Sequence, residues 1–286
     1  MAQKVLTETP YFMHKNHHPS IYLNQDTEGF FMKLLILTKR SLLALAICLL
    51  AGVAALGVTV SSASQAVQTA ATPKENPIYR VASDKKQVAI SFDAAWGNEQ
   101  TAELLDILDQ CNVKATFFLV GDWVEKFPGD VKAIAQKGHD IGNHSDTHPH
   151  LPQLSPDQAR AEITSCNQKI QSLTGKAPTL FRPPYGDYDN MVVNTVKGLG
   201  MYCVQWDVDS LDWKDPSPEQ MTKTVLDKVK DGSIVLMHNG AKNTPAALSA
   251  IIKGIQDKGY EIVLIRDLIP EGEYYTDVQG EMHLSN

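Results

Sequence analysis

The feature that most constrains the fold is a regular alternation of two residue patterns between Gln87 and Ile265. Short apolar stretches rich in β-branched residues, typical of strands, alternate with longer stretches whose apolar residues recur at helical spacing. Strands are predicted at residues 87–92, 115–120, 139–143, 179–182, 202–206, 234–238 and 261–265. Helices are predicted at residues 99–110, 129–137, 155–173, 189–199, 218–230 and 244–258. Because helical crossovers join parallel strands, the sequence predicts an α/β fold with a parallel sheet of about seven strands.

Polar residues at the predicted strand ends favour a barrel over an open doubly wound sheet. The positions concerned, each at or shortly after a strand end, are Asp93, His144, Arg182, Asp212 and His238. In a (β/α) barrel the loops after the strands gather at one face, where catalytic groups collect. The chain has no G-x-G-x-x-G after its first strand and no G-x-x-x-x-G-K-[ST] motif, so a dinucleotide site and a P-loop have no support.

A segment of different composition precedes this region. Residues 42–60 carry no charge, and a run of this length can cross a bilayer as a helix. Lys33, Lys39 and Arg40 lie before the run, and the next charge after it is Lys74. Because positive charges stay on the cytoplasmic side, we predict a single-pass protein of the cell membrane with its C-terminal bulk outside the cytoplasm.

The sequence leaves the processing of this segment open. Its length favours a retained transmembrane anchor, whereas Ser64-Gln65-Ala66 has the pattern of a signal cleavage site, which would make the protein secreted. Residues 1–41 are either a cytoplasmic tail or include a mis-assigned start before Met32. Residues 61–72 are rich in Ser, Ala, Gln and Thr, and we predict that they begin a flexible linker. The predicted boundaries beyond the membrane run are a linker at 61–77, a domain at 78–268 and a C-terminal tail at 269–286.

The composition narrows the class of partner. The formal net charge of −7 argues against a general nucleic-acid binder, which would carry a basic face. The four cysteines form no C-x-x-C pair, so we predict buried free thiols rather than a zinc knuckle or a disulfide framework. We expect a monomer, although no sequence feature reports directly on the oligomeric state.

A turn at residues 142–150 concentrates histidine. It holds His144, His148 and His150, in a chain with nine histidines in all. Neutral imidazole is the commonest side-chain ligand of a catalytic divalent metal, and two rings on one turn make half of such a site. Taken alone, the pattern is more often a polar surface loop, so its meaning depends on the motifs around it.

Five short motifs occur in an order that resembles the polysaccharide deacetylase family, the NodB homology domain or carbohydrate esterase family 4. They are Ser91-Phe92-Asp93, His144-Ser145-Asp146-Thr147-His148, Arg182-Pro183-Pro184-Tyr185-Gly186, Asp212-Trp213 and Leu236-Met237-His238. The variant first motif and the membrane segment look most like sporulation or cell-envelope members from spore-forming Gram-positive bacteria. The resemblance covers residues 78–268. It implies a distorted (β/α) barrel that hydrolyses N-acetyl, sometimes O-acetyl, groups on chitin-like or peptidoglycan sugars.

The resemblance also implies roles for the metal-binding and basic residues. His144 and His148 would hold zinc or, failing that, cobalt, nickel or manganese, which polarises the acetyl carbonyl and acidifies a water. Asp93 matches the general base that takes a proton from that water. Arg182 matches the residue that pairs with the base and orients it.

The remaining implied roles concern the leaving group, the oxyanion and the substrate. His238 matches the acid that protonates the leaving amine, and Asp212 the carboxylate that raises its pKa. The backbone N–H of Tyr185 would stabilise the tetrahedral oxyanion. Substrate contacts are expected from Trp213, Leu236 and Pro184, with ordinary core packing a nearly equal explanation for the first two.

One position departs from the family pattern. The usual first motif is T-F-D-D-G, whose second aspartate is the third metal ligand, whereas this chain has Ala94 there and reaches Gly97 two residues late. Alanine cannot bind a metal, and losing the carboxylate weakens the site. The residues considered as replacements are Glu99, Asn98, His150 and Asp146.

Three hypotheses remain from the sequence. The first is an active deacetylase of envelope glycan, favoured because the base, the acid and both of their partners are present. The second is an inactive glycan-binding or sporulation protein on the same fold. The third is a glycosidase on a shared barrel, which fits less well because that reaction needs two opposed carboxylates.

Overall fold

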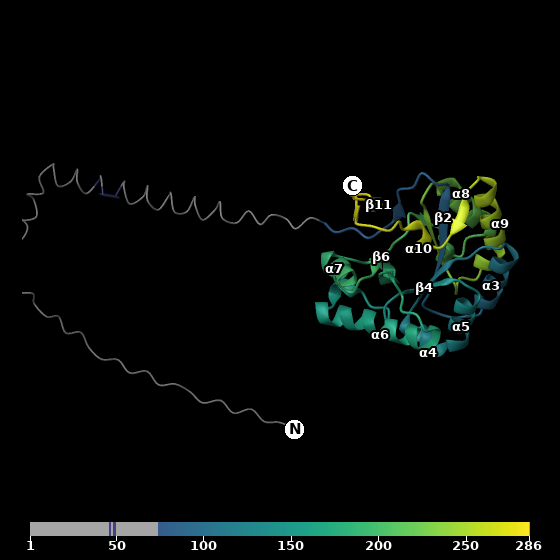
Figure 1. Cartoon of the computed structure of the whole chain (residues 1–286), viewed down its shortest axis with the longest axis horizontal. Coiled ribbons are helices and arrows are strands. Elements are labelled where there is room, and N and C mark those ends of the chain that lie inside the picture. Colours follow the sequence, from purple (N-terminus) through teal and green to yellow (C-terminus); the bar gives the residue numbers. More distant parts are fainter. Residues whose placement is uncertain (1–45, 47, 50–73, 286) are drawn as a thin grey trace, which may run out of the picture. The chain divides into compact units, whose positions relative to one another are not determined.

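The computed structural model describes residues 74–285 together with residues 46, 48 and 49 (Figure 1). Contacts divide the chain into Met1–Thr72 and Pro73–Asn286, and the fold is that of the second unit. The predicted cytoplasmic tail, nearly all of the membrane segment and most of the linker lie outside the described residues. Among the helices that are described, none is both long and apolar enough to cross a membrane.

An eight-stranded sheet forms the centre of this unit, with the order β6-β5-β4-β3-β2-β8-β7 and with β9 paired to β2. The strands are β2 Gln87–Ala94, β3 Thr116–Leu119, β4 Asp140–Asn143, β5 Leu180–Phe181, β6 Tyr202–Cys203, β7 Val208–Asp209, β8 Ile234–His238 and β9 Glu261–Val263. Every pairing in this sheet is parallel, as predicted. The edge strands β6 and β7 do not pair within the described residues, so the sheet is a curled half-barrel. The extra strand β7 was not predicted because its one apolar residue, Val208, lies between Asp207 and Asp209 and forms no apolar run.

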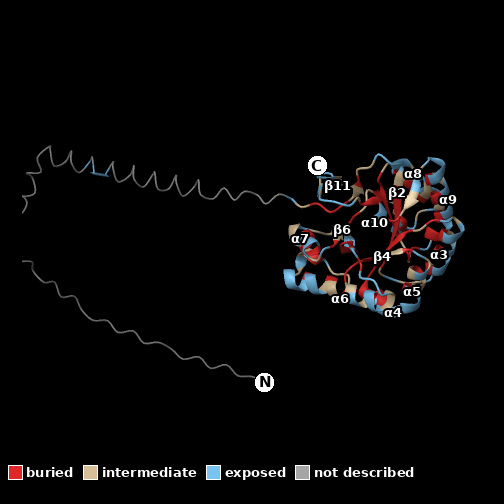
Figure 2. Ribbon diagram, viewed as in Figure 1, coloured by how far each residue is buried: buried red, intermediate tan, exposed pale blue. Residues whose placement is uncertain are grey.

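Helices cover the outer face of this sheet. They are α3 Thr101–Gln110, α4 Gly121–Lys126, α5 Pro128–Gln136, α6 Pro156–Thr174, α7 Asn190–Gly198, α8 Pro218–Lys228 and α9 Thr244–Asp257. The short helix α10 Ile265–Leu268 packs instead on the inner face, with Ala89 and Phe118. Ser155 and Ser217 start α6 and α8 with capping boxes, in which the serine and the glutamine three residues later satisfy each other's backbone N–H. Figure 2 shows buried residues along the strands and exposed residues on the outward helix faces.

The alternation of side chains along β2 positions the functional groups. Val88, Ile90, Phe92 and Ala94 are fully buried in the apolar cluster between the sheet and the helices. Successive side chains of a strand point to opposite faces, so Asp93 points to the interior of the half-barrel. The register pairs Asp93 with His238 on the neighbouring strand β8, which sets the two ionisable groups side by side at the strand ends.

A second, three-stranded sheet joins residues near the start of the second unit to its C-terminal residues, which corrects the prediction of a C-terminal tail at 269–286. Its strands are β1 Arg80–Val81, β10 Tyr274–Thr276 and β11 Glu281–Leu284, in the order β1-β11-β10. Isolated bridges join Ile78 to Val204 and Arg80 to Ser233, which links this sheet to both sides of the half-barrel. Cys166 and Cys203 are buried free thiols, as predicted, whereas Cys111 is half-buried and Cys48 is exposed.

Candidate active site

A cavity of about 350 Å³ opens at the carboxyl ends of the strands and collects most of the predicted site. The predicted residues on its wall are Asp93, His144, His148, Tyr185, Trp213, Leu236 and His238. Arg182 and Asp212 are fully buried behind this wall. Pro184, predicted as a substrate contact, is also buried and does not line the cavity, so its role is to shape the loop.

Backbone contacts hold the histidine turn that follows β4. The Asn143 side chain accepts a hydrogen bond from the Ser145 backbone N–H at 2.7 Å. The Glu162 carboxylate on α6 accepts from the backbone N–H groups of Asp146 and Thr147 at 3.0 and 2.8 Å. His148 has a φ of +61°, a left-handed conformation that a histidine adopts only when its surroundings impose it. The turn is therefore built to present its two histidine rings.

The two histidines converge on one point. Their Nε2 atoms lie 3.2 Å apart, close to the separation of about 3.4 Å for two nitrogen ligands of a tetrahedral zinc ion. Nδ1 of His144 lies 2.7 Å from the carbonyl oxygen of Arg182, which can only accept, so the lone pair of His144 is on Nε2. Burial lowers the pKa of both rings, that of His148 to about 4, so both are neutral at pH 7 and able to bind a metal.

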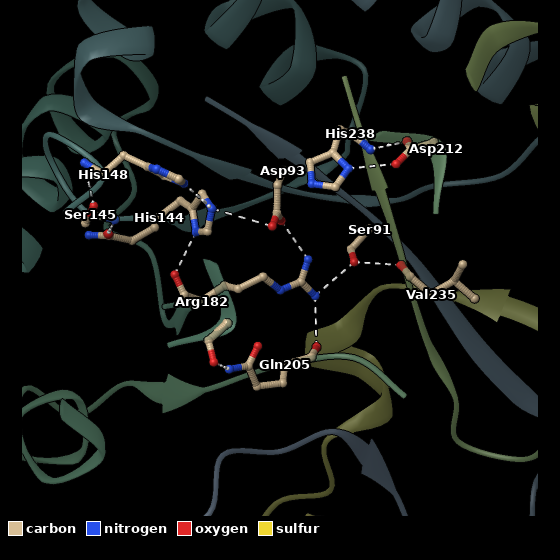
Figure 3. A network of polar contacts seen from close by, with 12 residues as sticks. Ser91, Asp93, His144, Ser145, His148, Arg182, Gln205, Asp212, Val235 and His238 are labelled. Carbon is tan, nitrogen blue, oxygen red and sulfur yellow. Dashed lines mark hydrogen bonds and ion pairs between the residues drawn. The ribbon is translucent and has the colours of Figure 1, made fainter. Parts of the chain in front are cut away.

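Asp93 lies between the histidines and a buried arginine, as Figure 3 shows. Arg182 donates from Nη1 to Asp93 Oδ1 at 2.7 Å, and from Nη2 to the Ser91 hydroxyl and the Gln205 carbonyl oxygen at 2.9 and 3.0 Å. Burial raises the pKa of Asp93, but the charge of Arg182 and, less strongly, the interactions with His144 and His238 lower it by more, so the net pKa is lowered. The carboxylate is therefore ionised, and its Oδ2 lies 3.5 Å from Nε2 of His144.

His238 lies on the other side of the cavity and has its own carboxylate. Its Nδ1 donates to Asp212 Oδ1 at 2.7 Å, while Asp212 Oδ2 accepts from the His238 backbone N–H and the Thr244 hydroxyl. Burial lowers the pKa of His238, but the hydrogen bond and the charge of Asp212 raise it by more, so the net pKa is raised. Because Nδ1 is engaged, Nε2 is the atom that can give a proton to a group in the cavity.

The loop after β5 presents Tyr185 at the cavity mouth. Tyr185 has a φ of +60°, and no described residue accepts a hydrogen bond from its backbone N–H. Its ring contacts that of His148 edge-on at 4.4 Å between centroids and stacks on His150 at 4.2 Å. His150 in turn pairs with Asp187 at 3.0 Å. The loop is thus held with a free N–H donor beside the histidine pair.

No described side chain supplies the third metal ligand. Glu99 accepts from the Asn98 backbone N–H, Asn98 donates its side-chain amide to Asp130, and neither lines the cavity. Asp146 bonds to Ser165 and Lys169, and His150 is paired as described. None of the four replacements considered from the sequence therefore lies at the site.

A set of three close ligand atoms does occur elsewhere among the described residues. It consists of Asp277, Glu281 and His283 around β11, at the opposite sheet. The His144–His148 pair consequently fits a metal as two ligands and not as a complete protein site.

Sequence reasoning did not select several residues that shape this site. Trp96 lines the cavity and lies over His238, with ring centroids 5.2 Å apart. Asp209 and Trp206 also line it, and Glu162 and Gln205 support it from behind. A tryptophan in the lengthened loop after the first motif was a usable signal for Trp96. Glu162 and Gln205 lie within ordinary helix and strand patterns and gave no signal.

Known proteins are similar to this chain over the region that forms the site. The family model for polysaccharide deacetylase matches residues 80–204. The uncharacterized protein YlxY of Bacillus subtilis is 38% identical over 195 residues, which cover 68% of this chain and 61% of YlxY. A peptidoglycan-N-acetylglucosamine deacetylase of Bacillus cereus is 39% identical over 186 residues, covering 64% of this chain and 68% of the relative. The chain thus spans about three fifths of YlxY.

Solved structures are also similar to this chain, and one of them is described as a pseudoenzyme. A wild-type protein from Bacillus anthracis, described as a CE4 family pseudoenzyme, is 38% identical with a TM-score of 0.65, covering 67% of this chain and 68% of that one. A mutant pseudoenzyme structure with the same identity and TM-score is described as having restored enzymatic activity. Similar proteins therefore include both named deacetylases and a pseudoenzyme.

Proposed function

We propose that this chain, which belongs to the polysaccharide deacetylase family, removes N-acetyl groups from sugars of cell-envelope glycan, with peptidoglycan as the substrate class. Two similarities support the proposal: the match to the family model and the named activity of the Bacillus cereus relative. The whole-protein substrate is part of the proposal because the chain spans only part of several relatives.

The observation that carries the proposal is the pairing of two oppositely tuned groups across one cavity. Asp93 and His238 are in register on adjacent strands, and each contacts a buried partner of opposite charge. Arg182 lowers the pKa of Asp93, which favours its ionised form, while Asp212 raises the pKa of His238, which favours its protonated form. Amide hydrolysis needs an ionised base and a protonated acid at the same pH, and opposite shifts of the two pKa values favour this combination.

The chain's own groups then have distinct tasks. Asp93 takes a proton from the water that attacks the acetyl carbonyl carbon. The Tyr185 backbone N–H donates to the oxygen that becomes negatively charged in the tetrahedral intermediate. His238 delivers its Nε2 proton to the amine nitrogen as the bond to the acetyl carbon breaks, which leaves acetate and a free amine. Trp213 and Leu236 line the cavity where the acetyl methyl group would lie.

A divalent ion would be held by His144 and His148, with zinc the expected metal and cobalt, nickel or manganese as alternatives. When bound, it would supply polarisation of the carbonyl and a lower pKa for water. His144 favours this assignment because its Nε2 lone pair and the Asp93 carboxylate face each other at 3.5 Å, so both would attract a cation bound there. With two protein ligands, we expect weaker binding than at a His-His-Asp site.

The test is acetate release by the full chain in detergent. N-Acetylglucosamine tetramer and purified peptidoglycan are supplied with Zn²⁺, with Co²⁺ or with a chelator. We expect acetate from wild type with metal, and none from Asp93→Asn, which keeps the shape of the base. Absence of acetate with both substrates and both metals would reject the proposal.

A second function is supported by one specific observation. The cavity lacks a third protein ligand for the metal, and a similar protein is described as a pseudoenzyme. A glycan-binding protein without turnover is therefore the alternative. Tetramer binding without acetate release under every metal condition would favour it.

We also propose that the domain acts outside the cytoplasm, tethered by residues 42–60 or secreted after cleavage. The support is the uncharged run and the preceding positive charges. Protease accessibility of the domain in intact cells, compared with lysed cells, tests this placement.

A further inference from the structure

The loop after β2 carries a cavity residue that the family motif does not supply. It reaches Gly97 two residues later than the T-F-D-D-G pattern and inserts Ala95 and Trp96 at the cavity. Three of the exposed large aromatic residues in the described part of the chain lie on this cavity wall, namely Trp96, Tyr185 and Trp213. Trp213 and Tyr185 belong to the motifs already discussed, whereas Trp96 has no assigned role.

Several contacts fix this loop in place. The Gly97 carbonyl oxygen accepts a hydrogen bond from Trp123 Nε1 on α4 at 2.6 Å. Gly97 has a φ of +57°, which glycine adopts without strain. Asn98 donates its side-chain amide to Asp130 on α5 at 2.7 Å. Because helices anchor the residues just after Trp96, its indole has a defined position and not a freely sampled one.

The indole lies against the acid side of the cavity. Its ring is tilted by 31° over the ring of His238 at 5.2 Å between centroids. It also packs closely on Gly240, where an added Cβ would come within 2.6 Å of the indole Nε1. Even so, 47% of Trp96 remains exposed. One side of the residue is thus held by the protein while the rest is open at the cavity.

We propose that Trp96 is a substrate-binding residue on which a hexopyranose ring of the glycan stacks beside His238. The inference rests on the proposed function, because it takes an acetylated glycan as the ligand. An aromatic ring offers a large, rigid surface at little entropy cost, and it suits the apolar C–H face of a pyranose. With Trp213 and Tyr185 also on the wall, the cavity offers such surfaces on more than one side.

Ordinary packing explains Trp96 less well. A tryptophan kept for stability would bury most of its surface, whereas nearly half of this residue is exposed. The glycine at position 240 leaves room for the indole, and the helix-anchored loop presents it at the cavity. An exposed aromatic residue held in this way at a cavity is typical of ligand contact.

The experiment measures binding without turnover. The full chain is titrated calorimetrically with N-acetylglucosamine tetramer in the presence of chelator, which removes the metal for turnover and leaves the buried Arg182–Asp93 pair intact. Into this chain we introduce Trp96→Ala, Trp96→Phe, Gly240→Ala and Tyr275→Ala. Gly240→Ala displaces Trp96 without removing it, because the added Cβ would come within 2.6 Å of both its indole Nε1 and its backbone carbonyl oxygen. Tyr275 is the matched control, because it is a similarly exposed aromatic residue, 54%, that does not line the cavity.

We expect Trp96→Ala to weaken tetramer binding about tenfold, Gly240→Ala to weaken it to a similar degree, and Trp96→Phe to retain most of the affinity. Tyr275→Ala should bind as the wild type does. Unchanged affinity in Trp96→Ala, equal losses in Trp96→Ala and Tyr275→Ala, or no binding by the wild type would each overturn the inference.

The outcome is separable from that of the proposed function. Trp96-dependent binding together with no acetate release from the chain supplied with metal would reject deacetylation and leave this inference standing. Acetate release with an unchanged KM in Trp96→Ala would support deacetylation and reject the role of Trp96.

Discussion

Arg182 and Asp93 form a buried ion pair, with Nη1 and Oδ1 2.7 Å apart and neither side chain more than 5% exposed. The arginine side chain also stacks on Phe118, with its guanidinium carbon 4.0 Å from the ring centroid. Its carbonyl oxygen accepts from His144 at 2.7 Å, so one residue orients both the base and a histidine of the proposed metal pair. A buried pair of this kind becomes costly when one charge is left alone.

Replacing Arg182 with Met should therefore destabilise the protein by about 3–5 kcal/mol at pH 7. The lowered pKa of Asp93 gives stability that is present above its unfolded value of about 3.9 and is lost as pH falls through the folded value. Arg182→Met lacks this stabilisation, so the difference in free energy of unfolding between wild type and variant should be smaller in acid. Urea unfolding at pH 7 and at pH 3, below the unfolded pKa of the carboxyl, measures both effects. In Arg182→Met/Asp93→Asn, most of the stability should return, and a single-variant loss below about 1 kcal/mol at pH 7 would contradict the argument.

Asp212 should control the titration of His238. Its hydrogen bond and charge outweigh the effect of burial and raise the pKa of the histidine, so Asp212→Asn should lower it. A raised pKa gives stability below the unfolded value of about 6.5, and this stability is lost as pH rises through the folded value. In the variant the alkaline limb of any activity profile should move to lower pH, because the acid is deprotonated earlier.

Proton NMR of the His238 ring measures this pKa without any need for activity. Asp209→Asn is the control, since Asp209 also raises the pKa but only through its charge and more weakly than Asp212. We expect the larger shift from Asp212→Asn. Equal shifts in the two variants would mean that the hydrogen bond is not the cause.

Periodicity predicted most of the fold because the long elements bury one regular face. The predicted helix at 155–173 matches α6, and the predicted strand at 234–238 matches β8. The two-residue strands β1 and β7 were missed because neither lies in a longer apolar run, whereas β5 and β6, of the same length, lie within the runs predicted at 179–182 and 202–206. The strands β10 and β11 pair with each other and were missed because β11 is held against β1, some two hundred residues away in the sequence, which no local period reveals.

The site was predicted from local motifs, and its supports were not. Asp93, His144, His148 and His238 were selected by type and spacing and all line one cavity. Contacts such as Glu162 to the histidine turn depend on how α6 packs, which no local spacing reveals. The replacement ligands failed for the same reason, since Glu99 lies close in sequence and yet bonds to its own loop.

The sequence also did not reveal which residue of the first motif faces the histidines, Ala94 or Ala95. The side chain of Ala94 is fully buried in the apolar cluster beneath the helices, whereas Ala95 lines the cavity. Ala95→Asp should therefore strengthen metal binding, while Ala94→Asp should place a charge among apolar side chains and destabilise the protein by about 3 kcal/mol or more. Co²⁺ absorption and calorimetry measure the affinity, and urea unfolding measures the stability.

Ala95→Asn is the matched control for that experiment, because it has the shape of aspartate without the charge. We expect a gain of tenfold or more in Co²⁺ affinity for Ala95→Asp over Ala95→Asn. Tight Co²⁺ binding by Ala94→Asp with wild-type stability would show that the pleat of β2 does not decide which position faces the histidines.

Glu162 should determine the rigidity of the histidine turn. Its carboxylate accepts from the Asp146 and Thr147 backbone N–H groups and from the Thr147 hydroxyl, and hydrogen bonds to a charged group contribute about 1.5–3 kcal/mol each. Glu162→Ala leaves these donors without an acceptor, so the two amides should exchange faster with solvent and Co²⁺ affinity should fall by about tenfold or more, as for other lost supports of metal ligands. Glu125→Ala is the control, because that carboxylate is largely exposed and pairs only with Lys169. Hydrogen exchange resolved at the two amides gives the answer, and wild-type exchange rates in Glu162→Ala would remove Glu162 from the site.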